Sequence, residues 1–159
     1  MPEHARPESL CALLRQFERT HYPTLSPAET ALCRIDNNTL NFIRIPGHWS
    51  SVDWENAGWG DPTFDIADLT THVSYLAVPS ERWDWVIERY CHLANKDQAT
   101  GERIQIHRQI LFVWWAARIA RSLYEIPAGL DARLAEWPAG WEGDLRTKYA
   151  HYVRLAEDS

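Results

Sequence analysis

The sequence predicts a mainly α-helical fold with a small β hairpin near its start. Two patterns support this fold class. After Gly60, apolar residues recur every three or four positions, which is typical of helices that bury one face. Between Ala31 and Trp54, short apolar stretches alternate with turn-forming residues, which is typical of short strands. A chain of 159 residues suits one compact domain with a core, so we expect a single domain over residues 1–159.

Five helices are predicted from the apolar spacing and from residues that start or stop helices. Asp61 can cap the second helix, and Pro62 suits its first position. The fourth helix is apolar nearly all round its centre, so we expect it to be buried. A loop is expected over residues 23–29. The predicted helices cover residues 7–21, 62–76, 79–93, 102–124 and 142–156.

Short β segments are predicted at residues 31–35, 41–45 and 49–54. The tripeptide Pro46-Gly47-His48 is a natural hairpin loop. If this loop holds three residues, counting back along both strands places Asn41 directly opposite Asp53. Directly opposed side chains have Cβ atoms about 5 Å apart. One Mg²⁺ ion could then contact an oxygen of each side chain and keep waters and phosphate oxygens as its other ligands.

Asp36 precedes Asn41 in the loop that leads into the hairpin. A carboxylate there could accept a proton from a substrate hydroxyl, or orient that hydroxyl, beside a metal-bound phosphate. Phosphoryl transfer needs these parts: an aligned acceptor and cations that absorb the charge of the transferring group. Each residue alone is more simply a turn, cap or strand residue. The prediction therefore depends on the combined spacing of Asp36, Asn41 and Asp53.

Three segments together resemble the C-terminal-lobe signature of the aminoglycoside phosphotransferase and choline kinase family, which has the protein-kinase-like fold. They are Asp36-x4-Asn41, Val52-Asp53-Trp54-Glu55 and Gly58–Ala67. The resemblance spans roughly residues 31–69, which would form the catalytic-loop and metal-loop region. Residues 1–30 would then be a leading helix and linker, and residues 70–159 the helical part of the lobe.

The resemblance implies a role for each matching residue. Asp36 would be the catalytic base, and Asn41 and Asp53 would hold the Mg²⁺ ions that bridge the ATP phosphates. Asp65 would support the catalytic loop structurally, through that loop's backbone amides. The implied cofactors are therefore Mg²⁺ and ATP, and no residues are assigned to nucleotide binding.

The chain also departs from the family pattern. The family commonly has His-Gly-Asp where this chain has Arg34-Ile35-Asp36. Residues 1–30 contain neither a Gly-rich loop nor a Val-Ala-x-Lys-like strand, which are the elements that grip ATP in the family's N-terminal lobe. We therefore expect that lobe to be absent and ATP binding by the isolated chain to be weak. We also expect an exposed face where the lobe would pack.

Two functions remain open from the sequence. The first is a phosphotransferase that moves the γ-phosphate of ATP to a hydroxyl of an aminoglycoside-like, choline-like or other small substrate. Such an enzyme would be incomplete as an isolated chain, and its partner would be the missing N-terminal lobe or a second copy. The alternative is a non-catalytic module, derived from a kinase lobe, that binds a ligand or a protein.

Composition argues against several other classes of function. The net charge of −6 disfavours nucleic-acid binding, which needs clustered Lys and Arg. No apolar run reaches the roughly 18 residues that span a bilayer, and the N-terminus lacks the apolar core of a signal peptide. We therefore expect a cytoplasmic protein without a membrane partner. The three cysteines show no Cys-x-x-Cys spacing, which argues against a disulfide framework or a zinc site.

Tryptophan is unusually frequent, with nine residues in the chain. Large aromatic side chains contribute much of the buried area in protein cores, so we expect most of these tryptophans to pack inside the domain. The alternative is that one or two of them line a pocket for a ring or a cation.

Overall fold

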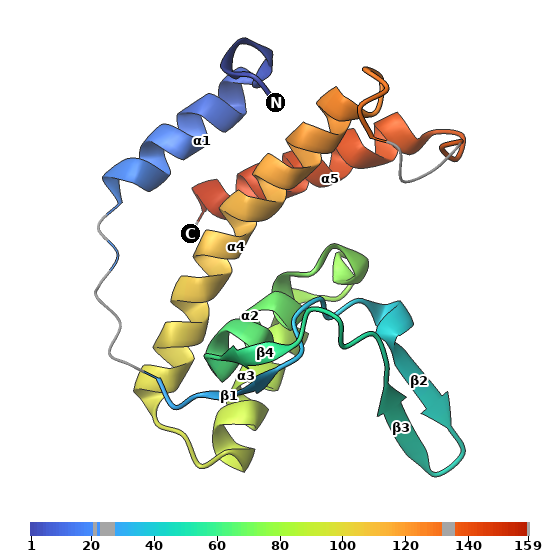
Figure 1. The fold of residues 1–159 in the computed structure, drawn as a ribbon. Helices are drawn as coiled ribbons and strands as arrows, with labels where there is room; N and C mark the ends of the chain where they lie inside the picture. The colour runs from blue at the N-terminus through green and yellow to red at the C-terminus, as the bar shows by residue number, and fades with distance from the viewer. Residues whose placement is uncertain (21, 23–27, 132–135, 159) are drawn as a thin grey trace. The chain divides into compact units, whose positions relative to one another are not determined.

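The computed structural model consists mainly of helices, with two small antiparallel sheets (Figure 1). This confirms the predicted fold class. The structure describes residues 1–20, 22, 28–131 and 136–158. The longer helices are α1 (Glu8–Arg19), α2 (Pro62–Thr71), α3 (Ser80–Leu93), α4 (Gln98–Glu125) and α5 (Trp141–Glu157). The strands are β1 (Ala31–Cys33), β2 (Phe42–Ile45), β3 (His48–Ser51) and β4 (Gly58–Gly60), and the 3-10 helices are η1 (Glu3–Ala5), η2 (Thr39–Asn41) and η3 (Val73–Tyr75).

The helices follow the predicted ranges, with differences at their ends. Helix α2 ends at Thr71 and not near residue 76, because His72 takes an extended conformation (φ −65°, ψ 138°) and starts η3. Helix α4 begins at Gln98, before the predicted residue 102, because Asp97 accepts hydrogen bonds from the backbone N–H and the hydroxyl of Thr100. The predicted end of the first helix at residue 21 and most of the loop at 23–29 lie outside the described residues.

The β hairpin is present, but its predicted register is wrong. Strands β2 and β3 pair Ile45 with His48, so the loop holds two residues, Pro46 and Gly47, and not three. Gly47 has a φ of 88°, which suits the second central position of a turn that starts with proline. The backbone N–H of Val52 consequently bonds to the carbonyl of Asn41 at 2.9 Å, so Val52 and not Asp53 lies opposite Asn41.

A second two-stranded sheet was not fully predicted. Strand β1 lies within the predicted segment 31–35, and it pairs with β4, with Ala31 opposite Gly60 and Cys33 opposite Gly58. Strand β4 has three residues, two of them glycine, so it lacks the alternation and the side chains that mark a strand in a sequence. This sheet joins the start of the candidate loop to the start of α2.

The chain groups into two compact units. The first unit consists of Met1–Tyr22 together with Phe112–Ser159, and the second consists of Pro23–Leu111. In the first unit, the fully buried Tyr152 stacks on Trp115 with a centroid distance of 5.7 Å, and the hydroxyls of Ser9 and Tyr149 are 2.7 Å apart. The single-domain organisation stays a prediction.

Within the described part of the chain, no helix has the length and apolar character needed to cross a membrane.

The second unit contains every predicted site residue. Its core consists of side chains from α2, α3 and α4, with Ala67, Ile87, Ile104 and Leu111 buried together. In Figure 1 the hairpin β2–β3 extends away from the helices of this unit. The core thus fixes α2, and α2 in turn carries the residues that hold the candidate loop.

The expectation that most tryptophans pack in the core is wrong. Trp115 on α4 is buried, but Trp114 beside it is 47% exposed and lies near the guanidinium of Arg118. The two-stranded hairpin offers too little structure to bury its aromatic residues, and an apolar residue type does not by itself determine burial. The other exposed tryptophans are Trp49, Trp54, Trp59 and Trp85.

Candidate functional site

The loop that carries Asp36 has an unusual backbone. Ile35 and Asp36 both lie in the left-handed region, with φ values of 53° and 59°. That conformation costs a residue with a Cβ roughly 1–2 kcal/mol, and it is especially uncommon for a β-branched residue such as Ile. The surrounding contacts must offset this strain, and several polar side chains supply them.

Asp65, on the first turn of α2, bonds to the loop backbone on one side of Asp36. Its Oδ2 accepts from the backbone N–H of Arg34 at 3.1 Å, and its Oδ1 accepts from the N–H of Ile35 at 2.9 Å. The start of a helix also favours a carboxylate, because the helix dipole is positive there. These contacts are of the kind that the resemblance assigns to Asp65.

Asn37 and Asp68 bond on the other side of Asp36, and sequence reasoning missed both residues. Oδ2 of Asp68 accepts from the backbone N–H and from the side-chain amide of Asn37, each at 3.0 Å, and both residues are buried. Asp68 lies one helical turn after Asp65. This i,i+3 spacing of two carboxylates on one face was the signal in the sequence that could have found it.

Arg34 is a buried part of the loop, at the position where the resembled family commonly has histidine. Its Nη2 donates to the backbone carbonyl of Asp36 at 2.6 Å, and its Nη1 donates to the carbonyl of Val52 at 3.3 Å. Its guanidinium also lies 4.6 Å from the ring centroid of Phe42. The Arg34 side chain therefore joins the loop to the end of strand β3, a role that sequence reasoning did not assign.

The Asp36 side chain is 41% exposed and faces one buried histidine that sequence reasoning also missed. Its Oδ1 lies 3.4 Å from Nε2 of His72. Burial lowers the pKa of His72, although the nearby carboxylates of Asp68 and Asp36 act in the opposite direction. The histidine is therefore held in its neutral form near neutral pH, and Asp36 remains open to solvent.

Asn41 is tied directly to the same loop. Its side-chain Nδ2 donates to the backbone carbonyl of Asp36 at 3.2 Å, and the residue is 8% exposed. Because the nitrogen of the amide is used in this bond, its oxygen is the atom left to bind a cation. The structure thus brings Asp36 and Asn41 together.

Asp53 follows Val52 at the end of the hairpin and is exposed, with a φ of 63°. Within the described residues, no hydrogen bond or ion pair involves its carboxylate. An amide oxygen and a carboxylate are hard ligands of the kind that Mg²⁺ takes, and it usually keeps several waters besides. The side chains of Asn41 and Asp53 therefore fit Mg²⁺ by chemistry. In the part of the chain that the structure describes, no cluster of three or more His, Cys, Asp or Glu residues suits a metal.

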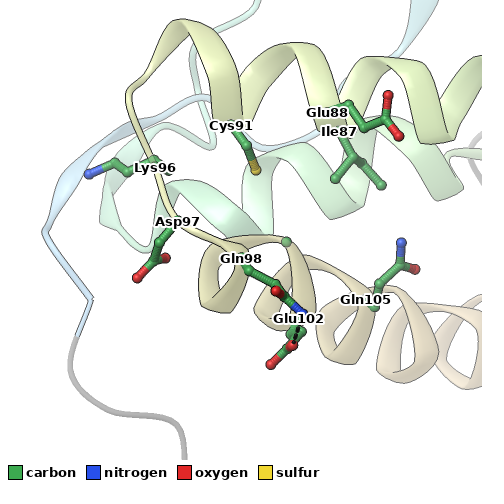
Figure 2. A pocket seen from close by; sticks show the side chains of 9 residues that line it. Ile87, Glu88, Cys91, Lys96, Asp97, Gln98, Glu102 and Gln105 are labelled. Carbon is green, nitrogen blue, oxygen red and sulfur yellow. Dashed lines mark hydrogen bonds between the residues drawn. The ribbon is translucent and has the colours of Figure 1, made fainter.

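A separate pocket of about 490 Å³ lies in the second unit and includes none of the predicted site residues. Figure 2 shows it between the end of α3 and the first turns of α4, with Ile87 and Cys91 facing Gln98 and Gln105. The remaining lining residues are Glu88, Lys96, Asp97, Gly101 and Glu102. No tryptophan lines this pocket.

Comparisons with known proteins give a partial similarity. No family model matches the chain. Two curated relatives, each called Protein LicA and from Haemophilus influenzae, are 29% identical over 116 residues, or 70% of this chain. That stretch is 41% of one relative, from strain ATCC 51907 / DSM 11121 / KW20 / Rd, and 32% of the other. The chain therefore spans less than half the length of these relatives.

One solved structure is similar over most of the chain. It is a choline/ethanolamine kinase family protein from Mesorhizobium loti, with 16% sequence identity and a TM-score of 0.49. The similarity covers 95% of this chain and 57% of that chain.

Proposed function

We propose that the chain is the acceptor and metal-binding part of a cytoplasmic phosphotransferase that moves the γ-phosphate of ATP to a hydroxyl group. The acceptor would be an aminoglycoside-like, choline-like or other small molecule. One observation carries the proposal: the exposed carboxylate of Asp36 lies on a strained loop that Asp65 and Arg34 hold in place. Strain that other residues maintain is common at catalytic sites.

Each proposed role uses an atom that is available in the fold. Asp36 accepts the proton of the substrate hydroxyl, which needs a carboxylate open to solvent. Asn41 and Asp53 hold Mg²⁺ through their side-chain oxygens. When bound, Mg²⁺ neutralises charge on the ATP phosphates. Asp65 keeps the loop in shape and does not contact the substrate.

The proposed enzyme needs a nucleotide-binding part that residues 1–159 do not supply. Residues 1–30 contain no Gly-rich loop for phosphates, and the lysines of the chain are Lys96 and Lys148. Lys96 hydrogen-bonds to Glu29, and Lys148 pairs with Asp144 on α5. The matched stretch also covers only 41% and 32% of the LicA relatives. We propose that an N-terminal lobe from outside residues 1–159, or a second copy of the chain, completes the site.

The test is a titration of the purified chain with ATP and Mg²⁺ by calorimetry, first alone and then with a candidate lobe protein. We expect weak or absent ATP binding by the chain alone and measurable binding in the complex. The Asp53→Ala variant should weaken Mg²⁺-dependent binding in the complex at least about tenfold, since it removes one of two protein ligands. Tight ATP binding by the chain alone, unaffected by Asp53→Ala, would contradict the proposal.

The alternative is a non-catalytic module that binds a ligand or a protein, and the pocket between α3 and α4 supports it. Its volume of about 490 Å³ lies within the range of small-molecule sites, roughly 300–1,000 Å³. This function predicts that a ligand is held by residues such as Gln105, and that Asp36→Asn leaves binding unchanged. The phosphotransferase predicts that Asp36→Asn abolishes transfer in the complex.

A further inference from the structure

We propose that His72 is a positioning residue for Asp36: its Nε2–H donates to Oδ1 and fixes which carboxylate oxygen is left for the substrate hydroxyl. The inference rests on the proposed role of Asp36. Its geometric basis is the distance of 3.4 Å between Nε2 of His72 and Oδ1 of Asp36. These residues lie far apart in the sequence and meet because His72 directly follows α2.

The tautomer of His72 follows from its second ring nitrogen. Nδ1 accepts a hydrogen bond from the backbone N–H of Ser74 at 3.2 Å, as the cap of the short helix η3. A nitrogen that accepts from an N–H carries no proton of its own, so in the neutral ring the proton is on Nε2. The ring therefore presents a donor toward the Asp36 carboxylate.

The position of the His72 ring is fixed by its surroundings. The residue is 6% exposed, and the ring makes an edge contact with Tyr75 at a centroid distance of 6.0 Å. Tyr75 in turn makes an edge contact with Trp83 on α3 at 5.7 Å. The donor thus belongs to a rigid group of rings and not to a mobile surface side chain.

The charged groups near His72 come from the loop and from α2. The carboxylates of Asp68 and Asp36 raise the pKa of His72, and the guanidinium of Arg34 lowers it, but burial has the largest effect and the net shift is downward. An imidazolium at this position would make Asp36 a weaker base, because its positive charge stabilises the carboxylate. A neutral imidazole orients the carboxylate without that charge.

The contact with His72 gives the two carboxylate oxygens of Asp36 different surroundings. Oδ1 faces His72, whereas no hydrogen bond to Oδ2 occurs within the described residues. Since the side chain is 41% exposed, Oδ2 is the oxygen that can accept a proton from a substrate hydroxyl. His72 thereby reduces the orientations that the carboxylate can take before the substrate arrives.

Two variants of His72 distinguish the capping role of Nδ1 from the donor role of Nε2. In His72→Asn, the side-chain oxygen can still cap Ser74, but the side chain is too short to reach Asp36. In His72→Gln, an amide N–H can reach the carboxylate and restore the donor. His92→Asn, at an exposed position on α3, is the matched control for loss of a histidine.

The test is nuclear magnetic resonance spectroscopy of the chain without substrate. We expect ¹⁵N shifts that identify the Nε2–H tautomer of His72. We also expect the ¹³Cγ signal of the Asp36 carboxylate to shift in His72→Asn, to shift less in His72→Gln, and to stay unchanged in His92→Asn. An Nδ1–H tautomer, or an Asp36 ¹³Cγ signal that is unchanged in His72→Asn, would overturn the inference.

This test also separates the inference from the proposed function. In a complex that transfers phosphate, His72→Asn should lower kcat about tenfold with little change in KM, and His72→Gln should recover part of the loss. Equal losses in both variants would contradict positioning by a donor. If no complex transfers phosphate while the Asp36 ¹³Cγ signal still shifts in His72→Asn, the proposed function is refuted and the contact between His72 and Asp36 stands.

Discussion

At the residue scale, one carboxylate determines the shape of the loop that carries Asp36. Asp65 accepts hydrogen bonds from two consecutive backbone N–H groups, of Arg34 and Ile35, and from the side-chain amide of Asn37. Ile35 is held in the left-handed region by these contacts. Asp65 helps to offset the cost of that conformation through its charge and both of its acceptor oxygens.

Replacing Asp65 with Asn should therefore destabilise the loop. The amide keeps one acceptor oxygen but loses the charge and the second acceptor, and it places an NH₂ group against a backbone N–H. Hydrogen bonds to charged groups contribute about 1.5–3 kcal/mol, so we expect the free energy of unfolding to fall by about 2 kcal/mol in urea titrations.

Asp144→Asn is the matched control, because Asp144 pairs with Lys148 on the surface of α5. Exposed pairs of this kind contribute about 0–1 kcal/mol, so this variant should unfold almost as the wild type does. Equal effects of Asp65→Asn and Asp144→Asn would show that Asp65 does not hold the loop.

The sequence allowed the four candidate residues to be named, but not the side chains that position them. Asp36, Asn41 and Asp53 were found through their spacing along the chain, and Asp65 through the resemblance of its segment to the kinase family. Their roles remain predictions. Arg34, Asn37 and His72 could not be found in this way, because their contacts depend on how α2 packs beside the loop. The bond between Asn37 and Asp68, for example, joins residues 31 positions apart.

At the element scale, a polar cluster connects the start of α2 to α4. Asp61 caps α2 by accepting from Thr63, and its Oδ2 accepts from Nε of Arg103 at 2.6 Å and lies 3.3 Å from Nε2 of His107. Burial alone would raise the pKa of Asp61, but the hydrogen bonds from Thr63, Arg103 and His107 outweigh it and lower the pKa to about 2.

This shift predicts a pH dependence of stability. A carboxylate whose folded pKa, about 2, lies below its ordinary value of 3.8 stabilises the fold above that ordinary value. The stabilisation is lost as the pH falls toward the folded pKa. We expect a difference in unfolding free energy between wild type and Asp61→Asn that is about 2 kcal/mol above pH 4 and decreases toward pH 2. A difference that does not change with pH would contradict this assignment.

The elements themselves could be predicted to different degrees. Helices were found because their apolar spacing persists over many residues and because Asp61 and Pro62 mark a start. The hairpin was predicted, but its register depends on whether the loop holds two residues, Pro46 and Gly47, or also includes His48. Because strand side chains repeat every two residues, that error changes every pair in the hairpin.

At the scale of the whole molecule, the exposed apolar residues concentrate in one stretch of the second unit. A monomeric protein rarely exposes so many large apolar side chains in one segment without a partner. This stretch, residues 32–59, includes residues of β1 and β4 and both strands of the hairpin. Its exposed large apolar residues are Leu32, Leu40, Ile43, Ile45, Trp49, Val52, Trp54 and Trp59.

We expect this stretch to support association with a partner lobe or a second copy. Sedimentation velocity over a range of concentrations should show self-association, and the double variant Trp49→Ser with Trp59→Ser should weaken it about tenfold or more, since buried aromatic residues contribute strongly to interfaces. Trp85→Ser, at an exposed position on α3, is the control and should have little effect. A chain that stays monomeric at every concentration, and binds no lobe, would count against this expectation.

We propose that Asn41 and Asp53 provide oxygen ligands for one divalent cation next to Asp36. The most direct test adds Mn²⁺, a paramagnetic substitute for Mg²⁺, to the isotope-labelled chain and records which backbone amide signals broaden. We expect the signals of Asp36, Asn41 and Asp53 to broaden first, and Asp53→Ala to remove the effect. Broadening centred elsewhere, for example at Glu88 and Asp97, or unchanged in Asp53→Ala, would contradict it.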